Sequence, residues 1–372
     1  MPSLTAYPLG NADSLLVELA NEKLLLFDFA DTHNPDDEAC KYIDLSTTLR
    51  TRLRAKNRTS LDIVAFTHLD RDHYQGASAF FSLAHSAAYQ GGERIAIDTL
   101  WVPACLITEP GHTDEAAIIQ REARYRLKRG EGIRVFSRPA ALRDWLAREG
   151  LTIESRAACL VDAGTLVPGL TRDGDGVEFF VHSPFAKRVG GTLIDRNADS
   201  LVFQATFVVD GVETYLMLCA DAPHDALSDL VEVTKSHGNE QRLAWDIFKL
   251  PHHCSYLSLS AEKGKDKTAP DPEIRWLFEQ GRQGGKIIAK SEPIPATDTD
   301  QPPHRQAAAY YEERRLAIGG EFLVTMAHPS VDHPAPLVID IGRLGATINR
   351  RIAGSGISAT TQRSPRFGAL DG

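Results

Sequence analysis

The chain has 372 residues, of which 42% are hydrophobic and 24% charged, and its formal net charge at pH 7 is −9. This is the composition of a globular protein long enough for two domains or for one large sandwich with insertions, and no apolar run approaches the roughly 20 residues of a membrane span. The negative net charge argues against an extensive nucleic-acid-binding surface, because clustered Lys and Arg are needed to neutralise phosphates.

The cysteines and the first residues indicate the cellular compartment that we expect for the protein. The five cysteines are odd in number and widely spaced, which is typical neither of a disulfide framework nor of a thiolate zinc motif. Residues 1–4 lead directly into strand-like sequence, without a basic segment followed by an apolar one. We therefore expect reduced thiols, no secretory signal, no membrane association and a cytoplasmic location.

The first part of the chain predicts alternating strands and helices. In chain order these are a hairpin of strands over 14–19 and 23–29, a helix over 37–56, a strand over 61–66 and a helix over 74–88. The strand over 61–66 ends immediately before His68. The polar segment that begins at His68 therefore lies on a loop at the carboxyl end of a strand.

The rest of the chain predicts one domain over residues 1–352 with a less regular segment at about 90–176, which we interpret as an insertion. The predicted elements are helices over 114–128, 139–148 and 225–235, and strands over 177–181, 200–209, 214–219 and 246–250. Residues 353–372 are rich in Ser, Thr, Gly and Arg, so we expect a disordered tail.

The segment His68-Leu69-Asp70-Arg71-Asp72-His73 has the residue types of a metal site. Residues two apart in an extended segment project to the same side, so His68 and Asp70 can share one cation while Asp72 and His73 face an adjacent position. Imidazole and carboxylate suit zinc, manganese or iron, and two such ions about 3.5–4 Å apart can clamp a bridging hydroxide. The segment alone also fits a polar loop with local hydrogen bonds.

Two distant residues strengthen the metal interpretation. Asp221 follows the apolar strand over 214–219, and His253 follows the strand over 246–250. Ligands bind at the carboxyl ends of strands in layered α/β folds, so we expect these side chains to converge with the His68 segment.

Taken in order, these motifs resemble the metallo-β-lactamase superfamily. Most of that superfamily has His where this chain has Asp70, and the pattern His-x-Asp-x-Asp-His is similar to the hydrolase domain of ComEC-type DNA-uptake proteins and their soluble relatives. Further matches are the segments at 10–14, 197–202 and 249–255. The resemblance implies an α/β fold with a four-layer αββα sandwich.

The resemblance also implies two divalent metal ions, zinc or manganese. His68 and Asp70 would hold the first ion, Asp72, His73 and His253 the second, and Asp221 would bridge them. Asp28 would orient the ligands from behind. The third ligand of the first ion is left open between the segment Asn197–Ser200 and His182.

We assign His252 to the substrate, because adjacent side chains rarely reach the same ion. Its imidazole could hydrogen-bond a phosphate oxygen or protonate a leaving group, which gives it a catalytic role beside Asp221 and Asp72. Asn197, Ser200 and His304 are predicted to bind substrate.

The leading functional prediction is hydrolysis of a phosphodiester, including nucleic acid, by a metal-bound hydroxide. The family likeness carries the substrate class, whereas the residues themselves indicate only hydrolytic chemistry. Hydrolysis of a lactone, thioester or β-lactam is one alternative, and a non-catalytic partner subunit of a nucleic-acid or defence assembly is another. The net charge predicts weak, salt-sensitive binding to long DNA unless residues 90–176 or a partner protein supply a basic surface.

Overall fold

Two β-sheets form the centre of the molecule. The structure is a computed structural model that describes residues 1–185 and 199–350. The strands of the first sheet are β1 (Ser3–Ala6), β2 (Leu15–Glu18), β3 (Leu24–Phe27), β4 (Ser60–Ala65), β5 (Ala96–Pro103), β6 (Ile133–Phe136), β7 (Leu160–Val161), β14 (Leu337–Gly342) and β15 (Gly345–Ile348). Their order is β15-β14-β1-β2-β3-β4-β5-β6-β7, antiparallel from β15 to β3 and parallel from β3 to β7.

The second sheet has the same mixture of directions. Its strands are β8 (Val177–Ser183), β9 (Val202–Val209), β10 (Val212–Leu218), β11 (Trp245–Lys249), β12 (Gly281–Ala289) and β13 (Glu321–Val324). Their order is β13-β12-β11-β10-β9-β8, with antiparallel pairing from β8 to β10 and parallel pairing from β10 to β13. The parallel strands β10 and β11 therefore end at the same edge of this sheet.

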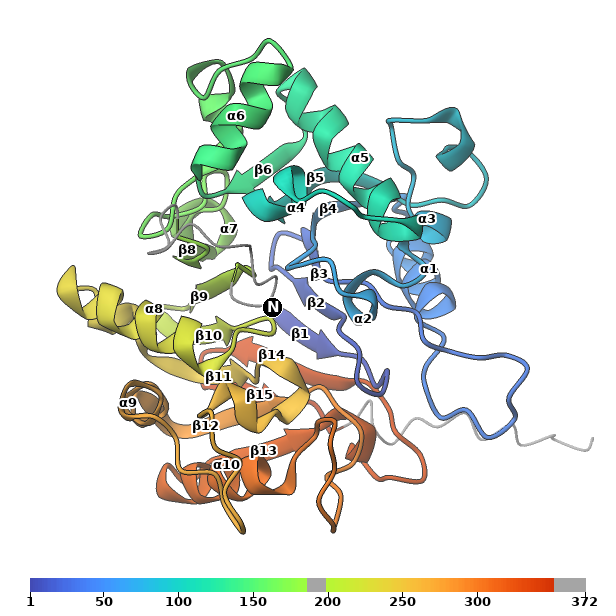
Figure 1. Cartoon of the computed structure of the whole chain (residues 1–372). Helices are drawn as coiled ribbons and strands as arrows, with labels where there is room; N and C mark the ends of the chain where they lie inside the picture. The colour runs from blue at the N-terminus through green and yellow to red at the C-terminus, as the bar shows by residue number, and fades with distance from the viewer. Residues whose placement is uncertain (186–198, 351–372) are drawn as a thin grey trace, which may run out of the picture.

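Helices cover the outer faces of both sheets. The α-helices are α1 (Leu45–Ala55), α2 (Arg71–Tyr74), α3 (Ala77–Phe80), α4 (Ala104–Thr108), α5 (Asp114–Arg129), α6 (Ala140–Arg148), α7 (Arg172–Asp175), α8 (His224–Ser236), α9 (Pro272–Glu279) and α10 (Arg305–Ala317). The short 3-10 helices are η1 (Ala87–Tyr89), η2 (Glu154–Cys159), η3 (Glu240–Leu243), η4 (His252–Cys254), η5 (Tyr256–Ser258) and η6 (Thr325–Ala327). Figure 1 shows α5 and α6 at one end of the molecule and α9 and α10 at the other, with the sheets between them.

The apolar side chains form three separate layers of core. One cluster lies between the two sheets, a second packs α1, α5 and α6 on the first sheet, and a third packs α8, α9 and α10 on the second. Strand β3 shows the reason, because Leu24 and Leu26 face the helices while Leu25 and Phe27 face the other sheet. The predicted α/β class and its four layers are confirmed.

Aromatic side chains from the two sheets interlock in the central layer. The ring of Phe27 in β3 lies 5.8 Å from that of Phe179 in β8, and the ring of Phe136 in β6 lies 5.2 Å from that of Phe203 in β9. Such rings bury large apolar areas and pack edge to face or offset. They fix the relative position of the sheets, and with it the position of the loops at their common edge.

Two predicted helices differ from the observed ones. The helix predicted over 37–56 begins only at Leu45, because the side chain of Asp44 accepts a hydrogen bond from Thr47 N at 2.7 Å and caps the helix there. The helix predicted over 74–88 was wrong in extent. Gly76 adopts φ +84° and separates the short helices α2 and α3, after which Phe81 pairs with Ile95 in a β-bridge.

The segment 90–176, interpreted as an insertion, supplies β5, β6 and β7 to the first sheet, where they continue directly from β4. Its status as an insertion stays a prediction. The predicted tail over 353–372 lies outside the described residues, as does Asn197. In the described part of the chain, every helix is too short or too polar to cross a membrane.

Candidate metal centre

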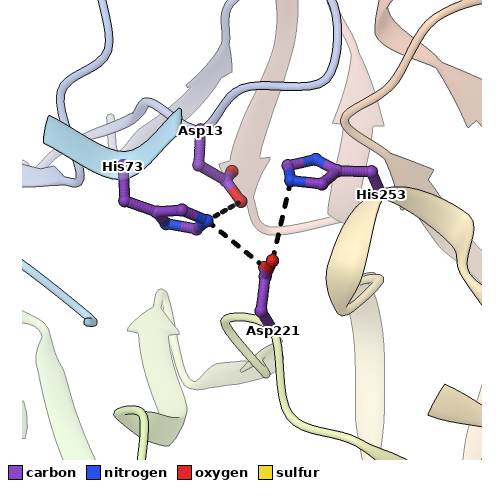
Figure 2. A group of neighbouring side chains, drawn as sticks. All are labelled: Asp13, His73, Asp221 and His253. Atoms are coloured by element: carbon purple, nitrogen blue, oxygen red, sulfur yellow. Dashed lines mark ion pairs between the residues drawn. The ribbon is translucent and has the colours of Figure 1, made fainter. Parts of the chain in front are cut away.

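Four buried side chains from distant parts of the chain meet at the common edge of the two sheets. They are Asp13 in the loop between β1 and β2, His73 in α2, Asp221 after β10 and His253 in η4. One ligand atom of each lies within 4.8 Å of the ligand atoms of the other three. Figure 2 shows the four side chains pointing toward one another. His73, Asp221 and His253 were predicted as ligands, whereas Asp13 was not.

The distances within the group are those of side chains around a shared centre. Nε2 of His73 lies 3.4 Å from Oδ1 of Asp221 and 3.9 Å from Oδ2 of Asp13. Nε2 of His253 lies 3.6 Å from Oδ2 of Asp221. Asp72, another predicted ligand, joins from the side with Oδ2 at 2.9 Å from Nε2 of His253 and 3.7 Å from Nε2 of His73.

The hydrogen bonds behind the histidines fix which ring nitrogen faces the centre. Nδ1 of His73 lies 2.9 Å from the carboxylate of Asp28, and Nδ1 of His253 lies 2.8 Å from the carbonyl of Lys290. These oxygens can only accept, so Nδ1 carries the hydrogen in each ring and Nε2 of the neutral ring carries a lone pair. Within the described residues, the buried Nε2 of His73 makes no hydrogen bond. Lone pairs that face carboxylate oxygens fit a divalent cation.

Asp28, which was predicted to orient ligands, contacts the ring of His73 on the side away from the centre. Its Oδ1 accepts from the backbone N–H of Thr67 at 2.7 Å, and its Oδ2 accepts from Thr67 Oγ1 at 2.7 Å and from His73. The backbone N–H of Asp28 donates to Ala65 O of β4. The parallel pair β3 and β4 thereby holds the imidazole of His73 in one orientation.

Asp13 is bound by two buried lysines. Nζ of Lys249, at the end of β11, lies 2.6 Å from Oδ2 of Asp13, and Nζ of Lys290, just after β12, lies 2.9 Å from Oδ1. Lys249 also lies 3.9 Å from Oδ1 of Asp221 and donates to Ala220 O. The segment at 10–14 matched the resembled family, but no sequence signal gave Asp13 or either lysine a role.

The pKa values show that the centre attracts positive charge. Burial lowers the pKa of His73, but the carboxylates of Asp221 and Asp28 outweigh burial and raise it well above its usual value. Burial likewise lowers the pKa of His253, and Asp221 and Asp72 outweigh it. Burial raises the pKa of Asp221, yet His73 and His253 hold it well below the ordinary range. Either protons or a cation must therefore balance these carboxylates.

Lysine pairing also controls the pKa of Asp13. Burial raises this pKa, and the opposing charges of Lys249 and Lys290 bring it below the usual value. Burial lowers the pKa of Lys249, but Asp13 and Asp221 raise it above its ordinary value. For Lys290 burial is the stronger effect and its pKa is lowered, although Asp13 opposes the change.

The predicted first metal position is only partly assembled by the described residues. His68 is buried, and burial lowers its pKa to about 4, so its ring is neutral. Its Nε2 has no hydrogen-bond partner in the part of the chain that the structure describes, and it lies 3.7 Å from Oδ2 of Asp70. The Asp70 side chain is 40% exposed, and neither residue belongs to the four-atom group. His68 lies beside that group, with its ring centroid 3.9 Å from that of His73.

Three of the residues predicted to contact substrate, His252, His304 and Ser200, lie around the same loops. The backbone N–H of His252 lies 3.3 Å from Oδ1 of Asp221, and its side chain is half-buried. His304 is buried, its backbone N–H donates to Cys254 O, and its Nδ1 accepts from the backbone N–H of Tyr256 at 3.3 Å. Ser200 is fully buried next to Leu201, whose N–H donates to Thr67 O.

His182, the alternative ligand for the first position, is used elsewhere. Its Nε2 lies 2.9 Å from the carbonyl of Arg242, and its Nδ1 lies 3.4 Å from Thr234 Oγ1 of α8. Burial lowers the pKa of His182 to about 4. Both nitrogens are therefore occupied in the packing of α8 on the second sheet.

The turn that carries His253 has an unusual backbone. His252, His253 and Cys254 have φ values of 46°, 51° and 67°. Left-handed conformations cost about 1–3 kcal/mol for residues other than glycine and concentrate at functional sites. Here they point His253 into the centre while Cys254 packs, fully buried, in the core of the second sheet.

Comparisons with known proteins give similarity in structure only. No family model matches the chain, and no curated protein matches its sequence. A protein from Parabacteroides distasonis described as a metal-dependent hydrolase is 11% identical, with 86% of this chain and 91% of that chain covered at a TM-score of 0.34. Unliganded yeast PDE1 is 11% identical, with 87% and 98% covered at a TM-score of 0.43. Zinc-bound PqqB from Methylobacterium extorquens is 10% identical, with 91% and 100% covered at a TM-score of 0.34.

Proposed function

We propose that the protein is a metal-dependent hydrolase of the metallo-β-lactamase superfamily that cleaves phosphodiesters. Asp72, His73, Asp221 and His253 are the proposed ligands of its resident cation. The observation that carries the proposal is that Nε2 of His73 faces Asp221 at 3.4 Å and Nε2 of His253 faces Asp72 at 2.9 Å, where a cation can replace the protons that these rings otherwise carry. A buried set of acceptors this close needs a positive charge between its members.

The chemistry of such a centre follows from its donor set. A bound divalent cation polarises a phosphoryl oxygen and lowers the pKa of water. Asp28 holds the ring of His73 and Lys290 O holds that of His253, so the nitrogens are fixed before a cation arrives. The backbone N–H of His252 orients Asp221. Fixed ligands of this kind lose little freedom on binding.

Two histidines are placed to meet the substrate. Nδ1 of His304 accepts a hydrogen bond from Tyr256 N, so Nε2 carries the hydrogen, and within the described residues it has no hydrogen-bond partner. A buried donor of this kind suits a phosphate oxygen. The side chain of His252 is half-buried and lies within the electrostatic influence of Asp221, which suits a group that donates a proton to a leaving oxygen. Ser200 is a further proposed contact, and Asn197, also predicted to bind substrate, lies outside the described residues.

The carboxylates favour a phosphodiester over an acyl substrate. Asp70 in place of the superfamily's usual histidine adds an oxygen ligand, and an oxygen-rich set favours hard cations such as manganese beside zinc. Displacement at phosphorus gains from a second cation near the first, because attacking and leaving oxygens are both stabilised. His68 and Asp70 lie next to the resident position, where a second ion would bind.

Hydrolysis of several ester classes side by side tests the proposal. The protein, loaded with manganese or zinc, is incubated with bis-p-nitrophenyl phosphate, single-stranded DNA, a lactone and a thioester. We expect turnover of the phosphodiesters, loss of turnover with a chelator, and loss in His73→Ala. His237→Ala is the matched control, because His237 lies at the exposed end of α8 and outside the proposed site.

The outcomes separate the candidate functions. Turnover of the lactone or thioester alone would refute the phosphodiesterase assignment and leave a metal-dependent acyl hydrolase. No turnover of any substrate by the metal-loaded protein would favour a partner subunit without catalysis.

A further inference from the structure

The two buried lysines at the metal centre give it an unusual charge. Lys249 and Lys290 are 4% and 0% exposed, and both Nζ atoms bind the same carboxylate, that of Asp13. A buried lysine is costly unless it is paired. Neither lysine contacts the outer surface, so their charges act on the centre itself.

The charges within the centre can be counted from its contacts. Four carboxylates lie in it, those of Asp13, Asp28, Asp72 and Asp221. The histidines are neutral when Nε2 binds a cation, because Nδ1 keeps its hydrogen. The two lysines leave a balance of minus two, which one divalent cation cancels.

A second cation changes this balance. Its position would be formed by His68, Asp70 and the shared Asp221, and the Asp70 carboxylate is 40% exposed. With Asp70 included, one divalent cation leaves one negative charge, whereas two leave an excess of one positive charge in a largely buried site. A phosphodiester carries one negative charge and cancels that excess. Its oxygen also adds a ligand to a position at which the described residues supply few.

We infer that Lys249 and Lys290 limit the free protein to one divalent cation, and that the second cation binds only together with a phosphodiester. The inference rests on the proposed function, because it takes the substrate to be a monoanion. The lysines are positioning residues, since they act through Asp13 and Asp221 rather than on the substrate. They make metal uptake and substrate uptake one coupled event.

Calorimetric titration of the metal-free protein with Mn²⁺ tests this without turnover. The probe is dimethyl phosphate, a phosphodiester monoanion whose hydrolysis is slow. We expect one bound Mn²⁺ in its absence and two in its presence. Two Mn²⁺ bound without dimethyl phosphate, or only one bound in its presence, would overturn the inference.

Two charge variants should shift metal binding in opposite directions. Lys290→Met removes a positive charge, so a second Mn²⁺ should bind without dimethyl phosphate, at least about tenfold more tightly than any second Mn²⁺ binds to the parent protein. Asp13→Asn removes a negative charge and should weaken the resident Mn²⁺ at least about tenfold. A purely structural role predicts that both variants weaken binding, and that result would contradict the inference.

The double variant guards against loss of folding. Asp13→Asn with Lys290→Met removes one charge of each sign, so it should recover the single Mn²⁺ of the parent protein. Circular dichroism of each metal-free variant reports folding. If Lys290→Met does not fold, the double variant is used for the test. Two Mn²⁺ bound to the double variant without dimethyl phosphate would overturn the inference.

The inference and the proposed function can be refuted independently of each other. If the protein binds a second Mn²⁺ with dimethyl phosphate but cleaves no ester, the inference about coupled binding stands and the proposed hydrolase activity is refuted. If the protein cleaves phosphodiesters but binds two Mn²⁺ in their absence, the proposed activity stands and the inference about coupled binding is refuted.

Discussion

Replacing Asp28 by Asn tests how His73, a proposed metal ligand, is held. The carboxylate of Asp28 accepts three hydrogen bonds, from Thr67 N, Thr67 Oγ1 and His73 Nδ1, at 2.7, 2.7 and 2.9 Å. The two oxygens of Asp28 accept from Thr67 N and from His73 Nδ1, one each. The amide of Asn has only one oxygen, so it cannot accept both hydrogen bonds in this arrangement. If its NH₂ group faces Nδ1, the hydrogen of the neutral ring moves to Nε2, where it blocks a cation.

The structure gives the size of both effects. One buried donor or acceptor is left without its partner, which should lower the free energy of unfolding by about 1–3 kcal/mol. Metal affinity should fall by about 10- to 100-fold, the usual cost of losing a partner behind a metal ligand. Urea unfolding of the metal-free protein measures the first effect, and calorimetric titration with Mn²⁺ measures the second.

Asp62→Asn is the matched control. Asp62 lies in β4 of the same sheet, and its Oδ2 accepts a backbone hydrogen bond from Leu24 N at 2.8 Å. This variant should lose some stability and keep its metal affinity. An Asp28→Asn protein that binds Mn²⁺ as tightly as the parent would refute the role given to Asp28.

Two other predictions concern histidines. His253→Ala should lose the resident cation, whereas His252→Ala should keep it and lose turnover; equal metal loss in both would show, by metal analysis, that the roles are wrongly divided. Burial lowers the pKa of His182 to about 4, so the unfolded protein binds a proton at this residue more readily than the folded protein does. The free energy of unfolding is therefore unaffected above the unfolded pKa near 6.5 and decreases as the pH falls toward 4. From pH 7 to pH 5 the metal-free protein should lose about 2 kcal/mol more than His182→Gln in urea unfolding. Parallel losses would contradict this.

The sequence located candidate ligands that follow apolar strands, and their role as ligands stays a prediction. The strands before His68, Asp221 and His253 were recognised from their apolar runs, and ligands at carboxyl ends of parallel strands meet at one edge. The helix predicted over 74–88 failed because Gly76 separates two short helices and because Phe81 then enters a β-bridge, and periodicity detects neither break.

Asp13 could not be found in this way. It lies in a loop among small and polar residues, and its two partners follow it by 236 and 277 positions. The pairing exists only because β11 and β12 are neighbours in the second sheet and end beside the loop between β1 and β2. Residue type and spacing alone do not reveal that two lysines share one buried carboxylate.

Anomalous scattering from crystals grown with Mn²⁺ tests the central claim most directly. We expect a peak within metal–ligand bonding distance, about 2 Å, of Nε2 of His73, Nε2 of His253 and the nearest oxygens of Asp72 and Asp221. A protein whose Mn²⁺ peaks lie away from these four side chains, or which shows no peak at all, would contradict the existence of a metal centre at this edge of the sheets.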